Sequence, residues 1–194
     1  MAAPKDPTRR TVVAALASLS LSGAAPARRG DADVRIGGSP VLVAYFSRSG
    51  NTRVVAGLIQ RAFQTDVFEI RPATPYPEEY LATVEQARQE RDRGDEPALE
   101  ARVHDLSDYE TIYLGFPIWG ETTPPIIRSF LSHHDLSGKT LIPFVTHGGY
   151  GLGNSRDVIT RHAPKARLQQ GFLMQADQER QTMERVNDWL QRSR

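Results

Sequence analysis

The sequence contains no cysteine among its 194 residues. Disulfide bridges, thiolate metal sites and cysteine nucleophiles are therefore excluded as sources of stability or chemistry. Charge of one sign is not in excess either, because 24 Lys and Arg side chains accompany 23 Asp and Glu side chains. Without a basic surplus, nucleic acid is not an expected partner.

Motifs of hydrolytic and metal-dependent catalysis are also missing. The sequence has no GxSxG motif, and no pattern in it indicates a Ser/His/Asp arrangement. His133 and His134 stand beside Asp135 without a spaced set of further ligands, so we expect no metal site. We therefore assign no catalytic residue to the protein itself.

A hydrophobic run long enough to span a membrane is absent from the N-terminal region. The apolar stretch over 11–25 is about fifteen residues long, whereas a spanning helix needs about 20. Arg9 and Arg10 precede this stretch, and an Ala-Pro-Ala sequence ends at Ala27, as in a twin-arginine signal peptide. We expect residues 1–27 to be that signal peptide and the protein to be exported, periplasmic or secreted, with no stable membrane anchor. The alternative is an alanine-rich, disordered N-terminus.

Apolar runs and amphipathic stretches alternate along the remainder of the chain. Strands are predicted over 41–46, 66–71, 111–116, 140–146 and 166–174. Helices are predicted over 51–64, 78–92, 124–134, 154–162 and 178–192. Strict alternation predicts an α/β domain over 40–194, a doubly wound five-stranded parallel sheet with helices on both faces, after a flexible lead-in over 28–39. The dense charge over 78–92 indicates a solvent-exposed helix with internal ion pairs more than a surface for a partner.

The loop over 47–52 joins the first strand to the first helix and is rich in hydroxyl groups. Its backbone N–H groups, three hydroxyls and a helix N-terminus, which Asn51 or Thr52 can cap, favour an anion site. The loop lacks both the GxxxxGK[ST] and the GxGxxG patterns, which excludes the usual triphosphate and dinucleotide sites. It suits a terminal monophosphate, and the alternative is an ordinary turn with polar caps.

Two further loops follow buried strands, over 117–123 and 146–155. In an open parallel sheet, ligands bind beyond the carboxyl ends of the strands. Trp119 could stack on a flat ring, or it could simply pack against the protein. Tyr150 could cover the other face of that ring, or it could be an exposed loop residue. His147 fits either a donor to a ligand or a histidine bonded to its own backbone. The three loops together favour a flat aromatic ligand that carries a phosphate.

The chain resembles the flavodoxin family in these three loops, and the match runs in order from Val41 to about Leu190. Exported flavodoxin-like proteins of bacteria also share the segments Pro75 to Tyr80, Asp108 to Trp119, and Ser137-Gly-Lys-Thr140 before Pro143-Phe144. The resemblance is greatest to exported flavodoxin-like proteins of bacteria, and it implies the strand order 2-1-3-4-5 and bound flavin mononucleotide (FMN). The FMN-binding residues that it implies are Ser47, Arg48, Ser49, Gly50, Asn51, Thr52, Pro117, Ile118, Trp119, Gly120, Thr146, His147, Gly148, Gly149, Tyr150 and Gly153.

The resemblance implies a redox protein that transfers electrons in the periplasm or outside the cell. Its partner would be a redox protein or a small-molecule acceptor such as a quinone. The alternative is an enzyme, an NAD(P)H-dependent reductase of quinones or other small acceptors that uses FMN and forms a homodimer. Electron carriers of this family are usually acidic and attract basic partners, so the near-neutral net charge of this chain argues against the carrier interpretation. A cofactor-free interaction module is a third interpretation, against which the hydroxyl loop and Trp119 both argue.

Overall fold

The computed structural model describes residues 40–175, 186 and 188–192, all within one compact unit, Asp33–Arg194. The predicted signal peptide over 1–27 and lead-in over 28–39 lie outside the described residues. So does most of the predicted helix over 178–192, of which residues 186 and 188–192 are described and are helical. No helix in the described part of the chain is long and apolar enough to cross a membrane.

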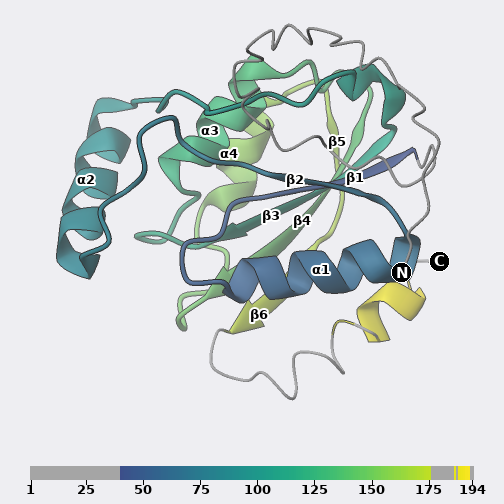
Figure 1. The fold of residues 1–194 in the computed structure, drawn as a ribbon, viewed down its shortest axis with the longest axis horizontal. Helices are drawn as coiled ribbons and strands as arrows, with labels where there is room; N and C mark the ends of the chain where they lie inside the picture. Colours follow the sequence, from purple (N-terminus) through teal and green to yellow (C-terminus); the bar gives the residue numbers. More distant parts are fainter. Residues whose placement is uncertain (1–39, 176–185, 187, 193–194) are drawn as a thin grey trace, which may run out of the picture. The chain divides into compact units, whose positions relative to one another are not determined.

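The described strands form one parallel sheet (Figure 1). They are β1 Val41–Tyr45, β2 Asp66–Glu69, β3 Thr111–Pro117, β4 Thr140–His147, β5 Arg167–Leu168 and β6 Phe172–Gln175. Their order is β2-β1-β3-β4-β5, with β6 also paired to β4, and every pair is parallel. The predicted strand order is therefore confirmed.

The prediction of one continuous last strand over 166–174 is wrong, because β5 and β6 are separate. Leu168 pairs with Leu141 and Phe172 pairs with Phe144, so the edge strand has one more residue than β4 between these pairs. Such an extra residue is a β-bulge, which interrupts the ladder locally. Gly171 lies in the interruption, where an added Cβ would lie 1.9 Å from the carbonyl oxygen of Pro143.

Helices cover both faces of the sheet, as the sequence predicts. They are α1 Asn51–Phe63, α2 Tyr80–Arg93, α3 Pro125–His133 and α4 Ser155–His162, with a short 3₁₀ helix at Leu106–Asp108. Helix α1 and the C-terminal helical residues pack on one face, and α3 and α4 pack on the other (Figure 1). Strand residues alternate between the two cores, so that Val43 faces α1 whereas Leu42 and Ala44 face α3.

Helix α2 differs from the others because it lies at the side of the sheet and buries few residues (Figure 1). Its buried residues are Thr83, Ala87 and Glu90, two of which are polar. The carboxylate of Glu79 caps its N-terminus by accepting from the backbone N–H groups of Leu81 and Ala82. Its position is therefore set by caps and polar contacts more than by an apolar face.

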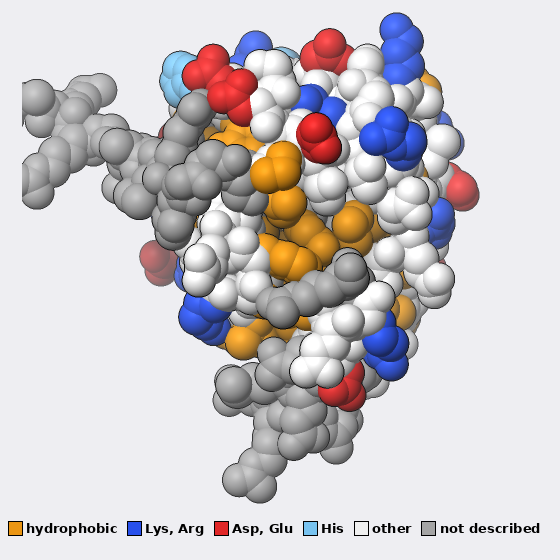
Figure 2. All heavy atoms as spheres, turned by 90° about the vertical axis from the view of Figure 1, so that its right-hand side faces the viewer, with side chains coloured by type: hydrophobic (Ala, Val, Ile, Leu, Met, Phe, Trp, Pro, Cys, Tyr) orange, Lys and Arg blue, Asp and Glu red, His pale blue; other side chains and the backbone are white. Residues whose placement is uncertain are grey.

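Charges of both signs are interspersed on the side of the molecule away from the loops that follow β1, β3 and β4 (Figure 2). Hydrophobic side chains are also visible on that side. Neither sign of charge gathers into a field on the face shown, in agreement with the near-neutral sequence.

Candidate functional site

The loops that follow β1, β3 and β4 meet at the carboxyl ends of these strands (Figure 1). The hydroxyls of Thr52, in the first turn of α1, and Thr146, in β4, are hydrogen-bonded at 2.9 Å. The N–H of Ile118 donates to the carbonyl of Thr146 at 2.8 Å, which ties the second loop to β4. The topology thus gathers the three sequence-predicted segments at one edge of the sheet.

The first loop turns into α1 at Gly50, whose φ of 94° is in the left-handed region that favours glycine. The Ser47 hydroxyl accepts from the N–H groups of Gly50, at 3.2 Å, and Arg53, at 3.3 Å. Within the described part of the chain, the N–H groups of residues 48, 49, 51 and 52 have no protein acceptor. Donors of this kind at a helix N-terminus are suited to bind an anion, as the sequence predicts.

The prediction that Asn51 or Thr52 caps α1 is wrong. Ser47 supplies the hydroxyl that accepts from the first turn, and the N-cap residue is Gly50, which has no side-chain cap. Thr52 is 1% exposed, and its hydroxyl is directed to Thr146 instead. A tertiary contact to β4 therefore determines which hydroxyl serves the helix end.

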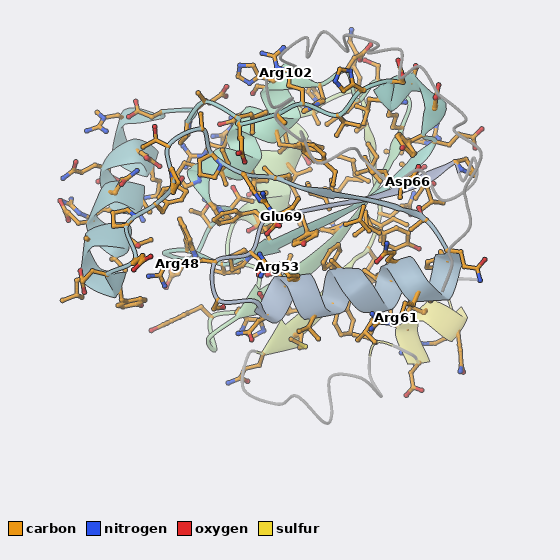
Figure 3. The ribbon with its side chains drawn as sticks, viewed as in Figure 1. Arg48, Arg53, Arg61, Asp66, Glu69 and Arg102 are labelled. Carbon is orange, nitrogen blue, oxygen red and sulfur yellow. The ribbon has the colours of Figure 1, made fainter. Side chains whose placement is uncertain are left out.

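Arginine side chains near the first loop are held away from the free N–H groups. Arg48 donates to the carbonyl oxygen of Glu78 at 2.8 Å and lies over the ring of Tyr80. Arg53 pairs with the carboxylate of Glu69, to which Arg71 also donates at 2.8 Å (Figure 3). Burial raises the pKa of Glu69, but the bonds from Arg71 and Arg53 outweigh it and lower the pKa below its ordinary value. The donors that this loop leaves for an anion are therefore amides and hydroxyls rather than arginine side chains.

Replacing Glu69 with glutamine is expected to strengthen the binding of a phosphorylated ligand about threefold at low salt, because it releases the charge of Arg53. The measurement is a ligand titration at low and at high ionic strength. Glu110→Gln, an exposed position at the amino end of β3, is the matched control and should leave the affinity unchanged. Equal affinities for Glu69→Gln and wild type at low salt would contradict the expectation.

Trp119, in the second loop, is held by aromatic neighbours. Its ring meets those of Phe46 and Tyr76 edge-on, with centroids 5.2 and 4.9 Å apart. Backbone hydrogen bonds in both directions join Trp119 to Thr122 across a turn that contains Gly120 and Glu121, both with positive φ. The indole is thus both packed and partly exposed, and it forms part of the wall of a cleft.

The third loop is organised by His147. Its Nδ1 accepts from the N–H groups of Gly149, at 3.0 Å, and Gly151, at 3.2 Å. An accepting Nδ1 carries no proton, so in the neutral ring the proton is on Nε2. The histidine is therefore bonded to its own backbone, one of the two sequence interpretations, and its other nitrogen is the one able to donate. Tyr150, at the tip of this loop, is 73% exposed.

Gly153 connects the third loop to the second. An added Cβ at Gly153 would lie 1.8 Å from the carbonyl oxygen of Glu121, which also accepts from the N–H of Asn154 at 3.1 Å. An added Cβ at Gly148, Gly149 or Gly151 would meet no atom within 4 Å. The backbones of the two loops therefore touch at Gly153, and the third loop is otherwise open to a ligand.

A cleft of about 570 Å³ lies between these loops and α2. Six predicted FMN-binding residues line it, namely Arg48, Ile118, Trp119, Gly120, Gly148 and Tyr150. Glu121, Thr122 and Thr123, from the predicted loop over 117–123, also line it. The residues that the sequence did not indicate are Tyr80, Thr83, Val84, Ala87, Arg88, Arg91 and Pro125. The α2 residues were missed because that helix is charged and weakly amphipathic. These residues recur every three or four positions, which places them on one face of the helix, and this spacing could have indicated them.

The buried hydroxyl of Thr123 is an unusual feature of this cleft. Its oxygen has no hydrogen-bond partner within the described part of the chain, and the residue is fully buried. Buried polar atoms without partners are rare, and they often lie next to a ligand or water site. No cluster of metal-ligating side chains is found among the described residues.

Residues 40–193 match the family model described as flavodoxin. Structures assigned as flavoproteins from Bacteroides eggerthii and Bacteroides uniformis share 31% and 32% identity, each with a TM-score of 0.67. Each match covers 78% of this chain, and it covers 95% of the B. eggerthii chain and 97% of the B. uniformis chain. A flavoprotein from Lactobacillus acidophilus, in complex with FMN, is 19% identical with a TM-score of 0.61, over 74% of this chain and 97% of its own.

Comparison with curated proteins gave no match. The family match nevertheless extends from β1 to the C-terminal helical residues, and the two Bacteroides proteins exceed 30% identity over most of both chains. The strand order agrees with that match. The chain belongs to the flavodoxin family.

Proposed function

We propose that the protein binds FMN and transfers electrons as a flavodoxin-like redox protein in the periplasm or outside the cell. The observation that carries this proposal is the set of unpaired N–H groups at residues 48, 49, 51 and 52, beside a cleft with aromatic walls. The donors suit a monophosphate, and the cleft suits a flat ring. The proposed location rests on the twin-arginine pattern of the sequence alone.

The residues present fit FMN in charge and in shape. The loop over 47–52 offers amides and hydroxyls to the phosphate, with Arg53 already paired to Glu69. Trp119 and Tyr150 offer aromatic surface to the ring, and the unpartnered hydroxyl of Thr123 offers a hydrogen bond to a ligand in the cleft. The flavin, when bound, would supply the capacity to accept and release electrons, and the protein would set its orientation and exposure to water.

The test is a titration of the flavin-free protein with FMN, riboflavin and FAD, followed by visible absorbance and flavin fluorescence. FMN is expected to bind about 100-fold more tightly than riboflavin, because only FMN brings the phosphate to the loop over 47–52. FAD should also bind more weakly, since its phosphate is not terminal. Equal affinity for FMN and riboflavin would refute the phosphate site, and failure to bind any flavin would refute the proposal.

The cleft favours one second candidate, an FMN-dependent reductase of small acceptors that takes electrons from NADH or NADPH. The cleft of about 570 Å³ is lined by α2 as well as by the predicted ring-binding loops, and a reductase needs space for a small acceptor next to its flavin. Steady-state oxidation of NADH and of NADPH with a quinone present separates the two functions. Rapid turnover would favour the reductase, and slow turnover with bound FMN would favour the carrier.

A further inference from the structure

Arg128 is an arginine that the protein buries without an acidic partner. It lies in α3 and is only 9% exposed. Within the described part of the chain, no ion pair and no hydrogen bond joins its guanidinium to another group. Buried charges in proteins are ordinarily paired, because removing a charge from water is costly. An unpaired guanidinium in this position therefore indicates a partner that the chain itself does not supply.

The nitrogens of Arg128 can be reached from outside the protein. Among the described residues, the side-chain polar atoms that are both fully buried and unpaired belong to Thr123 and Ser155, not to Arg128. Because the nitrogens of Arg128 are unpaired, they must touch solvent. Arg128 also does not line the cleft between α2 and the three loops. Its planar fork of N–H donors is thus available at a place separate from the predicted flavin site.

Two further arginines lie on the helices that α3 contacts, α2 and α4 (Figure 1). Arg91 is in the last turn of α2 and is paired with Asp92. Arg161 is in the last turn of α4, is exposed, and has no ion pair among the described residues. Burial lowers the pKa of Arg128, and the charges of Arg91 and Arg161 lower it further. Arg128 and Arg161 are therefore near one another, and both lack a carboxylate partner.

Glu96 is a carboxylate close to this pair of arginines, but it is engaged elsewhere. Its Oε1 accepts from the hydroxyl of Ser132 at 2.7 Å and lies 3.6 Å from Nε2 of His162. Its charge acts to raise the pKa of Arg128, yet the two groups form no ion pair. These contacts also bring the last turns of α3 and α4 together. Positive charge therefore remains in excess where the two helices meet.

We propose that Arg128 and Arg161 form a binding site for a doubly charged oxyanion, between α3 and α4 and apart from the loop over 47–52. Arg128 would donate to two oxygens through its planar fork, and Arg161 would approach from the solvent side. A phosphate group has the required charge and oxygen geometry. It can arrive as the free ion or as the end of an organic molecule, and the site would recognise the same group in both. The inference does not depend on flavin binding.

The experiment uses FMN-saturated protein, so that the loop over 47–52 is already filled. Inorganic phosphate and phenyl phosphate are the two probes, and the thermal unfolding midpoint is measured as each is added at constant ionic strength. The variants are Arg128→Met, which keeps an unbranched side chain, and Arg161→Gln. Arg156→Gln is the matched control, because Arg156 lies on the same helix as Arg161 and donates to the carbonyl oxygen of Gln169 at 3.1 Å.

Phosphate at about ten times its dissociation constant is expected to raise the midpoint of the wild type by about 3 °C. Arg128→Met should weaken phosphate binding at least about tenfold and Arg161→Gln about threefold, whereas Arg156→Gln should not change it. Without phosphate, Arg128→Met should unfold at the wild-type temperature or above it, because the variant removes an unpaired buried charge. Tighter binding of phenyl phosphate would identify an organic phosphate as the ligand, and tighter binding of inorganic phosphate would identify the free ion.

Three results would overturn the inference. The first is a wild-type midpoint that neither probe shifts, and the second is an equal loss of binding in Arg128→Met and Arg156→Gln. The third is a midpoint of Arg128→Met well below that of the wild type without phosphate, since Arg128 would then serve the fold. If FMN does not bind, the proposed function fails alone, because the same comparison of variants in the flavin-free protein still tests the site at Arg128.

Discussion

The Gly153→Ala variant is expected to be less stable than the wild type by roughly 2–4 kcal/mol and to bind FMN at least about tenfold more weakly. Gly153 has a φ of 51°, which an L side chain adopts only with strain. The added methyl group would also lie 1.8 Å from the Glu121 carbonyl oxygen. A backbone atom cannot rotate aside, so the second and third loops would have to separate.

The control is Gly148→Ala in the same loop. Gly148 has no positive φ, and no atom lies within 4 Å of an added Cβ, so its stability should stay within about 0.5 kcal/mol of wild type. Urea denaturation measures the stability of both variants, and flavin fluorescence measures the FMN affinity of Gly153→Ala. If Gly153→Ala is as stable as Gly148→Ala, then the contact between the two loops is not required by the fold.

The second large effect is expected at Glu90, where alanine should destabilise the protein by roughly 2–3 kcal/mol. Glu90 is 7% exposed and accepts from the Tyr76 hydroxyl at 2.9 Å and from Gln86 at 2.7 Å. Burial and the nearby carboxylate raise the pKa of Tyr76, so its hydroxyl remains a proton donor at all ordinary pH values. Without Glu90, this partly buried donor loses its acceptor.

The effect of Glu90→Ala should extend to the cleft. Helix α2 buries little apolar surface, so the loss of Glu90 should increase hydrogen exchange across Tyr80–Arg93. Tyr76 also contacts Trp119, with ring centroids 4.9 Å apart, so the tryptophan emission should shift as well. Both readouts report on the wall of the cleft rather than on global unfolding.

Glu85→Ala is the matched control for Glu90→Ala. Glu85 lies on the same helix and its bond to Arg88 lowers its pKa to about 2, but the group is fully exposed, so its removal should not change stability measurably. A second control is the double variant Glu90→Ala with Tyr76→Phe. Its loss of stability should be smaller than the sum of the losses in the two single variants. Additive losses would mean that the Tyr76–Glu90 bond does not hold α2.

The sheet was predictable because each central strand is an apolar run that ends at a distinctive loop. Buried parallel strands need apolar residues on both faces, and β1, β3 and β4 have them. The meeting of the three loops followed from parallel topology, which places the carboxyl ends of strands at one edge. The family match agrees with the predicted fold.

Three features depended on tertiary contacts and were not predictable from local sequence. Ser47 accepts from the helix N-terminus because Thr52 turns to Thr146, a residue far along the chain. The bulge before Phe172 follows from the register against β4. The α2 wall of the cleft was missed because the helix is placed by the Tyr76–Glu90 bond, and a hydrophobic pattern does not reveal such a bond.

The interruption between β5 and β6 has a consequence for how the protein behaves at high concentration. These strands lie at one end of the described sheet, where a smooth row of backbone donors and acceptors would invite a strand from a neighbouring molecule. The extra residue twists that row and breaks its spacing. The irregularity that made the last strand hard to predict from the sequence is therefore expected to weaken edge-to-edge pairing with a neighbouring molecule.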